Sequence, residues 1–372
     1  MNTINEQKQF FSLLQAGLWG GKPSVALFAP AQTDWMSLLK RGKKQALLGI
    51  AFDGMQALPE ELRPARPIYL QWCNLVSQIE EENHQLNGEI RNLFTLYREG
   101  GLTPILLKGQ GVAQNYRNPL HRQSGDIDVY IGKKDYERAN QLLRQEHATN
   151  EHEEHKKHSS FTWHGVEVEN HCMIANLNAP RADEAFQHRT AFWFPNGKEV
   201  EVDGYRVLVP PVEFDAVFLL IHAAIHFLGT GIGLRQVCDW TCLLHAHHSN
   251  LDQRRVITFL QQTGMYRMAK AFGAIAVTCL GLPASELPFE LEPDDLDRGE
   301  QLLVDILQMG NFGQYDAQTK PRPKGYWSGK WHTYRKITTR CRQFGAYAPT
   351  EARWYPVRLA LDSLQIQIKK RL

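Results

Sequence analysis

The chain has 372 residues, of which 43% are hydrophobic, 22% charged and 10% aromatic. This composition is typical of globular proteins and excludes collagen-like, coiled-coil and disordered classes. The 42 basic and 40 acidic residues leave a net charge of +2, so overall charge does not call for a nucleic-acid partner. Six cysteines without a C-x-x-C spacing exclude a disulfide scaffold and argue against a structural zinc site.

Targeting signals are not evident in the sequence. The first residues lack a basic segment followed by an apolar core, which a signal peptide requires. The longest apolar stretch, residues 216–228, contains His222 and His226 and is too short and too polar to span a bilayer. We therefore expect a soluble, cytoplasmic protein that does not associate with membranes.

The periodicity of apolar residues divides the chain into three regions. Residues 1–100 have helical spacing, clearest in residues 68–97, where Gly100 and Gly101 then favour a helix end. Residues 101–210 are predicted to form a compact α+β core, and residues 211–372 to be helical again. Within the core, strands are predicted at 103–107, 126–131, 161–163, 166–174, 199–202 and 205–209, with a helix at 135–146 and a hairpin turn at Asp203-Gly204.

Two acidic residues alternate with apolar ones in the predicted strand at 126–131. Residues two apart in a strand point the same way, so Asp126 and Asp128 share one face while Ile127 and Val129 share the other. Paired carboxylates suit a hard cation such as Mg²⁺. The strand therefore predicts a metal-binding face.

A third carboxylate is available in the predicted strand at 166–174. Alternation there places Glu169 and His171 on one face. Two carboxylates on one strand and a third on a neighbour make a two-metal site. We expect Asp126, Asp128 and Glu169 to hold two Mg²⁺ ions, or Mn²⁺ in their place, while His171 is expected in the core or behind the ligands.

Groups that suit a phosphate precede the acidic strand. Gly109 and Gly111 free backbone N–H groups to approach an anion. Lys108 and Arg122 add positive charge, although either side chain can instead pair with a carboxylate. Lys108, Gly109, Gln110 and Arg122 are the candidate nucleotide-binding residues.

These motifs together resemble the DNA polymerase β-like nucleotidyltransferase superfamily. More narrowly, they resemble a family of uncharacterised bacterial nucleotidyltransferases with a Leu-Lys-Gly start. The motifs are Leu-Lys-Gly at 107–109, Tyr116, Arg122, Asp-x-Asp at 126–128 and Glu-x-His at 169–171. That family also tends to have a histidine-bearing helix and a Leu-Arg-x-x-x-Asp motif, which match His222, His226 and residues 234–239. The resemblance covers about residues 102–175 and 211–245.

The resemblance implies a mixed sheet with flanking helices and a Mg²⁺-dependent transfer of a nucleoside monophosphate. A nucleoside triphosphate would be the donor, and pyrophosphate the leaving group. Asp126 and Asp128 match the family's metal-binding pair, Glu169 its third carboxylate and Gly109 its turn glycine, whereas Gln110 stands where the superfamily usually has Ser or Gly. The acceptor is left open among a small molecule, a protein and transfer RNA. The alternative is a catalytically silent member that binds a nucleotide, RNA or a protein.

Several other polar residues have simpler interpretations. Arg235 and Asp239, four residues apart on a predicted helix, indicate an ion pair within that helix, with a supporting role near the cleft as the alternative. His222 and His226 are expected to be buried, as are Cys238 and Cys242. The histidines of the charged run at 152–158 could bind a transition metal, but an exposed loop is favoured.

The C-terminal end is strongly basic. From Lys320 onward there are 13 Lys and Arg residues and two acidic residues, so these positions sum to +11 and the first 319 to −9. Aromatic residues are interleaved with the bases, namely Trp327, Trp331, Tyr334, Trp354 and Tyr355. Such a surface could hold RNA or a polyphosphate. The alternative is a solvated helical face whose aromatic residues point inward.

Overall fold

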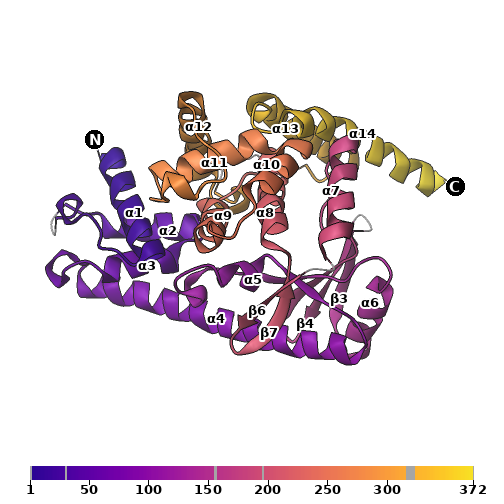
Figure 1. Ribbon diagram of the computed structural model, residues 1–372, viewed down its shortest axis with the longest axis horizontal. Coiled ribbons are helices and arrows are strands. Elements are labelled where there is room, and N and C mark those ends of the chain that lie inside the picture. Colours follow the sequence, from indigo (N-terminus) through magenta and orange to yellow (C-terminus); the bar gives the residue numbers. More distant parts are fainter. Residues whose placement is uncertain (1, 30–31, 155–156, 195–196, 316–322, 372) are drawn as a thin grey trace.

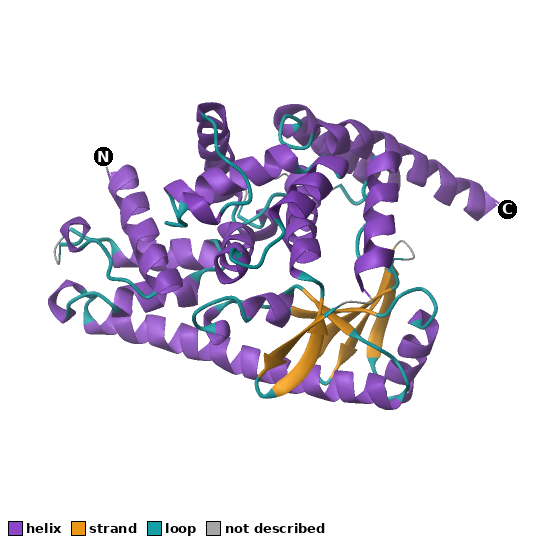
Figure 2. Cartoon of the chain, viewed as in Figure 1, coloured by secondary structure: helices purple, strands orange, loops and turns teal. Residues whose placement is uncertain are grey.

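The structure is a computed structural model that describes residues 2–29, 32–154, 157–194, 197–315 and 323–371. It is a mixed α+β fold in which a central sheet lies between a long N-terminal helix and a C-terminal group of helices (Figures 1 and 2). The predicted fold class is therefore confirmed. Figure 1 shows the N-terminal helices at one end of the molecule and the C-terminal helix projecting at the other.

The N-terminal region is helical, as predicted. Its elements are α1 (Asn2–Trp19), η1 (Val25–Leu27), α2 (Trp35–Lys44), α3 (Leu48–Gln56), η2 (Glu60–Leu62) and α4 (Arg66–Glu99). Asp34 caps the N-terminus of helix α2, because its carboxylate accepts a hydrogen bond from the backbone N–H of Ser37 at 2.9 Å. Helix α4 has 34 residues and ends at Gly100, so it is long enough to run beneath the whole sheet (Figure 1).

The central region contains a seven-stranded sheet in the order β3-β4-β5-β2-β1-β7-β6. Strands β2 and β5 are parallel, as are β1 and β7, and the other neighbours are antiparallel. The elements in chain order are β1 (Ile105–Leu107), α5 (Gly109–Ala113), η3 (Pro119–His121), β2 (Asp126–Tyr130), α6 (Tyr136–Gln145), β3 (Thr149–Glu154), β4 (His158–Trp163), β5 (Val166–His171), α7 (Pro180–Trp193), β6 (Lys198–Val202) and β7 (Tyr205–Val209).

Strand alternation gives the sheet two different faces. Ile127, Val129 and Val168 are buried in an apolar cluster with residues of α4 and α6. Asn170, on the same face, accepts a 2.7 Å hydrogen bond from the hydroxyl of Tyr97 on α4. The opposite face carries the acidic residues and turns toward the C-terminal helices.

The C-terminal region is again helical. Its elements are α8 (Val212–Gly229), α9 (Leu234–His247), α10 (Gln253–Gln262), α11 (Tyr266–Thr278), η5 (Ala284–Glu286), α12 (Pro293–Met309), η6 (Asn311–Gly313), α13 (Tyr326–Phe344) and α14 (Pro349–Arg371). Cys238 and Cys242 are buried, as predicted, and all six cysteines are free.

Helix α8 is the central helix of this region. It is the one helix of the described residues that is long and apolar enough to cross a membrane, and 67% of it is buried inside the protein. Core helices of soluble proteins meet the same criterion, so this property assigns no membrane role. The largest apolar cluster contains residues from each of the three predicted regions, from Phe10 to Ala352, and the proposed domain boundaries stay a prediction.

One part of the core differs from the sequence-based expectation. The charged run at 152–158 was expected to be an exposed loop, but strand β3 ends at Glu154 and β4 begins at His158. The two strands pair with each other, and β4 pairs along its whole length with β5. Strand β3 is the edge strand and β4 lies next to it, and His152 on β3 is exposed, so charged residues fit a strand here as well as a loop. Helix α7 was also not predicted.

Candidate active site

Three carboxylates converge on the open face of the sheet. Strands β2 and β5 are parallel neighbours whose register places Asp128 opposite Glu169, and Asp126 lies two residues before Asp128 on the same face. Carboxylate oxygens of Asp126, Asp128 and Glu169 lie within 4.8 Å of one another. The convergence expected from strand alternation is present.

Lys108 reaches this cluster from the end of β1. Its Nζ lies 2.9 Å from Oδ2 of Asp128. The backbone of Lys108 is left-handed, with φ 49° and ψ −140°, and Gly109 follows with φ 42°. Two successive residues with positive φ make a sharp turn into α5, and such a conformation is costly at a lysine. The turn carries the lysine side chain back over β2.

Two histidines border the carboxylates on the other side. His171 Nε2 lies 2.9 Å from Oδ1 of Asp128 and 3.2 Å from Oε2 of Glu169. His158, from β4, places its Nε2 3.6 Å from Oε1 of Glu169. Sequence analysis did not include His158 in the site, because nothing in the charged run showed that β4 pairs with β5.

The electrostatics of the two aspartates are opposite. The charge of Asp128, together with burial, raises the pKa of Asp126 to about 6. Burial alone would raise the pKa of Asp128, but Lys108 and His171 more than offset it and hold that pKa well below its usual value. Burial would likewise lower the pKa values of Lys108 and His171, yet the neighbouring carboxylates raise both.

The donor set fits Mg²⁺. All three converging side chains offer oxygen, the ligand that a hard cation prefers. Asp126 is repelled by Asp128, and a divalent cation between them would relieve that repulsion. Asp126, Asp128 and Glu169 are therefore the residues that could hold the metal.

A cleft of about 610 Å³ lies above this cluster. Its floor is the acidic face of the sheet, and its walls come from α8, α9 and the segment after α12. Lining residues include Lys108, Gly109, Gln123, Asp126, Asp128, Glu167, Glu169, His171, His222, His226, Arg235, Asn311 and Phe312. The region after residue 210 thus forms part of the site.

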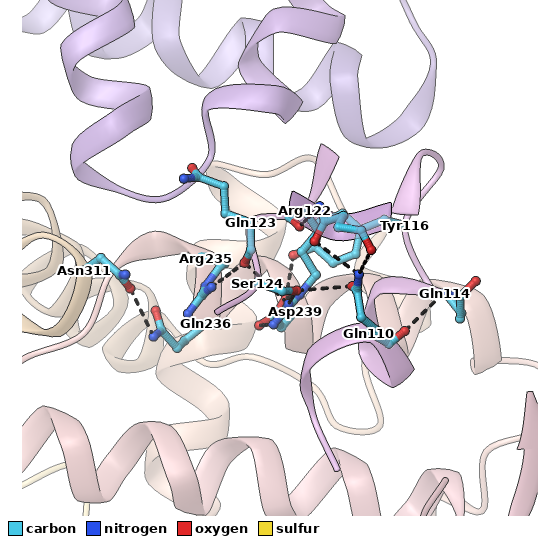
Figure 3. Close-up of polar contacts among 11 residues, drawn as sticks. Gln110, Gln114, Tyr116, Arg122, Gln123, Ser124, Arg235, Gln236, Asp239 and Asn311 are labelled. Carbon is cyan, nitrogen blue, oxygen red and sulfur yellow. Dashed lines mark hydrogen bonds and ion pairs between the residues drawn. The ribbon is translucent and has the colours of Figure 1, made fainter. Parts of the chain in front are cut away.

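Arg122 and Asp239 join the floor of the cleft to its wall (Figure 3). Arg122 donates from Nε and Nη2 to the two carboxylate oxygens of Asp239, at 2.7 and 2.8 Å, and both side chains are buried. The hydroxyl of Tyr116 donates to the same carboxylate at 2.7 Å. The ion pair expected within the helix between Arg235 and Asp239 is thus wrong, because Asp239 turns toward Arg122 instead.

Gln110 lies behind the cleft rather than in it. Its side chain is buried, its Nε2 donates to Oδ1 of Asn83 at 3.1 Å, and its Oε1 accepts from the hydroxyl of Ser124 at 3.2 Å. It therefore braces the segment that leads into β2 (Figure 3). Gly109 and Lys108 line the cleft.

Arg235 is a cation in the cleft wall. Its Nη1 donates to the carbonyl of Gln123, and its Nε has no hydrogen-bond partner among the described residues (Figure 3). Burial and the nearby Arg122 lower its pKa. Its guanidinium lies 5.9 Å from the centre of the Phe312 ring. Because Arg235 lines the cleft, its positive charge lies beside any anionic ligand bound there.

The two helix histidines were expected to be buried in the core, but His222 and His226 line the cleft. Their rings lie 4.5 Å apart, and the ring of Phe312 lies 5.0 Å from that of His226.

Phe312 has a left-handed backbone, with φ 50° and ψ 28°. Sequence analysis did not single it out, because the left-handed conformation leaves no signal in a phenylalanine.

The basic C-terminal end contains both exposed and buried residues. Trp327 and Trp331 are 68% and 66% exposed, so the inward orientation does not hold for them. Arg340 is buried, and it pairs with Asp305 at 3.0 Å and donates to the carbonyl of Phe227 at 2.8 Å. Lys320 lies outside the described residues.

Comparison with known proteins identifies one family. Residues 31–281, more than half of the chain, match the family described as uncharacterised nucleotidyltransferase. No curated protein and no solved structure matches the chain. The matched span contains the whole sheet, α8 and α9, and it ends before the segment that carries Phe312.

Proposed function

Because the chain belongs to the family of uncharacterised nucleotidyltransferases, we propose that it transfers a nucleoside monophosphate from a nucleoside triphosphate to an acceptor hydroxyl. Mg²⁺ is the proposed cofactor. The observation that carries the proposal is the convergence of Asp126, Asp128 and Glu169 at the floor of a cleft. When bound there, the metal would neutralise the phosphates and activate the attacking oxygen.

Each carboxylate has a distinct part in this reaction. Asp126 and Asp128 hold the metal at the floor of the cleft. Glu169 completes the metal site and orients the acceptor hydroxyl, whose proton leaves to solvent. The acceptor oxygen forms a bond to the α-phosphorus, the bond between that phosphorus and the bridging oxygen breaks, and pyrophosphate leaves. Catalysis in this site is positioning and charge neutralisation.

Two cations lie where the triphosphate would enter. Lys108 borders the carboxylates, and Arg235 extends the positive charge along the wall of the cleft. Arg122 is occupied by Asp239, so we assign it to holding the cleft together rather than to the phosphates. The same assignment applies to Gln110.

The acceptor stays open among a small molecule, a protein side chain and transfer RNA. The exposed tryptophans Trp327 and Trp331, set among basic residues, favour transfer RNA over the other two. A cytoplasmic location remains our expectation.

Incubation of the full chain with labelled nucleoside triphosphates, Mg²⁺ and a cell extract tests the proposal. We expect a labelled product that disappears with Asp126→Asn and persists with Glu201→Gln, an exposed strand carboxylate outside the cleft. Labelling that is equal in the Asp126→Asn protein would reject this site. Nucleotide binding with Mg²⁺ but without a labelled product would identify the catalytically silent alternative.

A further inference from the structure

His158, Glu169 and His171 form a second group of metal ligands, of a different chemical kind. Their ligand atoms lie within 4.8 Å of one another. Two of the three donors are imidazole nitrogens, whereas the Asp126, Asp128 and Glu169 group offers only oxygen. Imidazole suits first-row transition ions such as Zn²⁺, Co²⁺ and Mn²⁺, and Mg²⁺ prefers oxygen.

The sheet register builds this second group. His158 on β4 lies directly opposite His171 on β5 in an antiparallel pair, so the two side chains share a face. Their rings lie 4.8 Å apart. Glu169 is two residues before His171 on the same strand, which places its carboxylate on that face as well.

The spacing between the donor atoms suits one ion. Ligands about 2.0–2.1 Å from a tetrahedral ion lie about 3.4 Å from each other. Glu169 Oε1 is 3.6 Å from His158 Nε2, and the other oxygen, Oε2, is 3.2 Å from His171 Nε2, so the carboxylate would contact a shared ion through both oxygens. The three residues also line the cleft, so a ligand or water could complete the coordination.

We propose that His158, Glu169 and His171 bind a divalent transition ion beside the all-oxygen position, with Glu169 shared between the two. The inference concerns metal binding by this chain and does not depend on nucleotidyl transfer. A carboxylate that bridges two ions is typical of two-metal sites, in which the ions lie about 3.5–4 Å apart. The site would therefore hold two ions, one that prefers oxygen ligands and one that prefers imidazole ligands.

The rival explanation is that protonated histidines pair with the carboxylates and bind no metal. The metal-stripped full chain, titrated with Co²⁺ alone, separates the two. Nitrogen ligands and a low coordination number should make the visible absorption of bound Co²⁺ stronger than that of aqueous Co²⁺. Zn²⁺ should abolish this absorption, and an excess of Mg²⁺ should leave it in place.

His158→Gln is the decisive variant, because it removes one imidazole ligand while the side chains of Asp128, Lys108 and His171 stay unaltered. Removal of one ligand should weaken Co²⁺ binding at least tenfold, since even partners behind the ligands are worth about 10- to 100-fold. His158→Asn should behave the same way, and circular dichroism should show that both variants are folded. His188→Gln, an exposed histidine on α7, should bind Co²⁺ as the unaltered chain does.

Weak absorption like that of aqueous Co²⁺, displacement by Mg²⁺, or unchanged binding in both His158 variants would overturn the inference. Labelling with nucleoside triphosphates and Mg²⁺ is measured separately on the same proteins. If labelling persists while Co²⁺ binding fails, only the transition-metal position is lost. If Co²⁺ binds while labelling fails, the proposed activity is lost and this inference stands.

Discussion

Each carboxylate oxygen of Asp128 has a nitrogen of another side chain 2.9 Å away, and Lys108 provides one of the two nitrogens. Lys108 Nζ lies 2.9 Å from Oδ2, while His171 Nε2 lies 2.9 Å from Oδ1. Asp126 belongs to the same group of three but is repelled by Asp128, which raises the pKa of Asp126 to about 6. Two residues with the same proposed role in metal binding therefore differ in what they contribute to folding.

Asp126→Asn and Asp128→Asn should have opposite effects on the free energy of unfolding. Asp126→Asn removes a repelled charge and should stabilise the metal-free protein at pH 7, by on the order of 1–3 kcal/mol. Asp128→Asn leaves Lys108 and His171 without their shared partner and should destabilise it, by roughly 3–5 kcal/mol as for other broken buried pairs. Urea unfolding measures both.

The same two variants should lose nucleotidyl transfer together. Each removes a negative ligand of the metal, and a loss on the order of 10³-fold corresponds to about 4 kcal/mol of barrier. Initial rates of label incorporation under saturating Mg²⁺ provide the measurement. Full activity in a folded Asp126→Asn or Asp128→Asn protein would show that the metal lies elsewhere.

The stability of the metal-free protein should depend on pH through Asp126. Its folded pKa of about 6 exceeds the unfolded value of 3.8, so the folded state holds more protons between these pH values. This contribution to stability is present below about pH 4 and is lost as pH rises through about 6. Mg²⁺ should therefore raise the melting temperature more at pH 7.5 than at pH 5, and Asp126→Asn should remove that difference.

The buried pair of Arg122 and Asp239 should be essential for stability. Asp239→Asn leaves a buried guanidinium without its carboxylate and should cost about 3–5 kcal/mol of unfolding free energy. Arg144→Gln serves as the matched control, because Arg144 is 41% exposed and pairs with Glu137 and Glu151 at the surface. That change should cost no more than about 1 kcal/mol. Equal losses of unfolding free energy in the two variants would show that the buried pair of Arg122 and Asp239 is no more important for stability than a surface pair.

Arg235→Gln should weaken nucleotide binding without weakening the fold. Arg235 is a partly unsatisfied cation in the cleft wall, so its removal relieves a buried charge while taking a donor from the triphosphate. We expect a dissociation constant at least about tenfold higher, or about 1.4 kcal/mol. Arg254→Gln, exposed on α10, is the control. Titration with a fluorescent nucleotide analogue gives the comparison, and an unchanged constant for Arg235→Gln would remove it from the binding site.

If the C-terminal end contacts transfer RNA, binding should weaken with salt because each phosphate contact releases counterions. Arg340 is buried and paired, so it is left out of the test. The bases to be changed to Gln are Lys330, Arg335, Lys336 and Arg342. Four phosphate contacts predict a slope of about −2.8 to −3.6 in log K against log salt. RNA binding that is absent at low salt, or indifferent to these changes, would leave a small molecule or a protein as the acceptor.

Strand periodicity accounts for what the sequence could reveal of this site. Alternation alone places Asp126 and Asp128 on one face and Glu169 on the corresponding face of its own strand. The parallel pairing of β2 with β5, which brings the three together, is a tertiary property. Grouping Glu169 with the two aspartates took that pairing for granted, and the family resemblance then supported it, since nothing in the local sequence specifies which strands are neighbours.

The residues that sequence reasoning misplaced are those whose environment is set far along the chain. Arg235 and Asp239 have the spacing of an ion pair within a helix. The carboxylate of Asp239 instead accepts two hydrogen bonds from Arg122, which lies 117 positions away in the chain. His158 lies in a run of charges that suits solvent, and only its cross-strand neighbour His171 brings it into the site. In both cases burial and pairing outweigh local spacing.

The segment that carries Phe312 lines the cleft from outside the span that matches the family. Its ring lies beside His226 and Arg235 at the cleft, although the family match ends at residue 281. The three carboxylates lie within the span that matches the family, whereas Phe312 lies outside it. Substitutions in this segment can therefore reshape the rim of the cleft while leaving all three carboxylates in place.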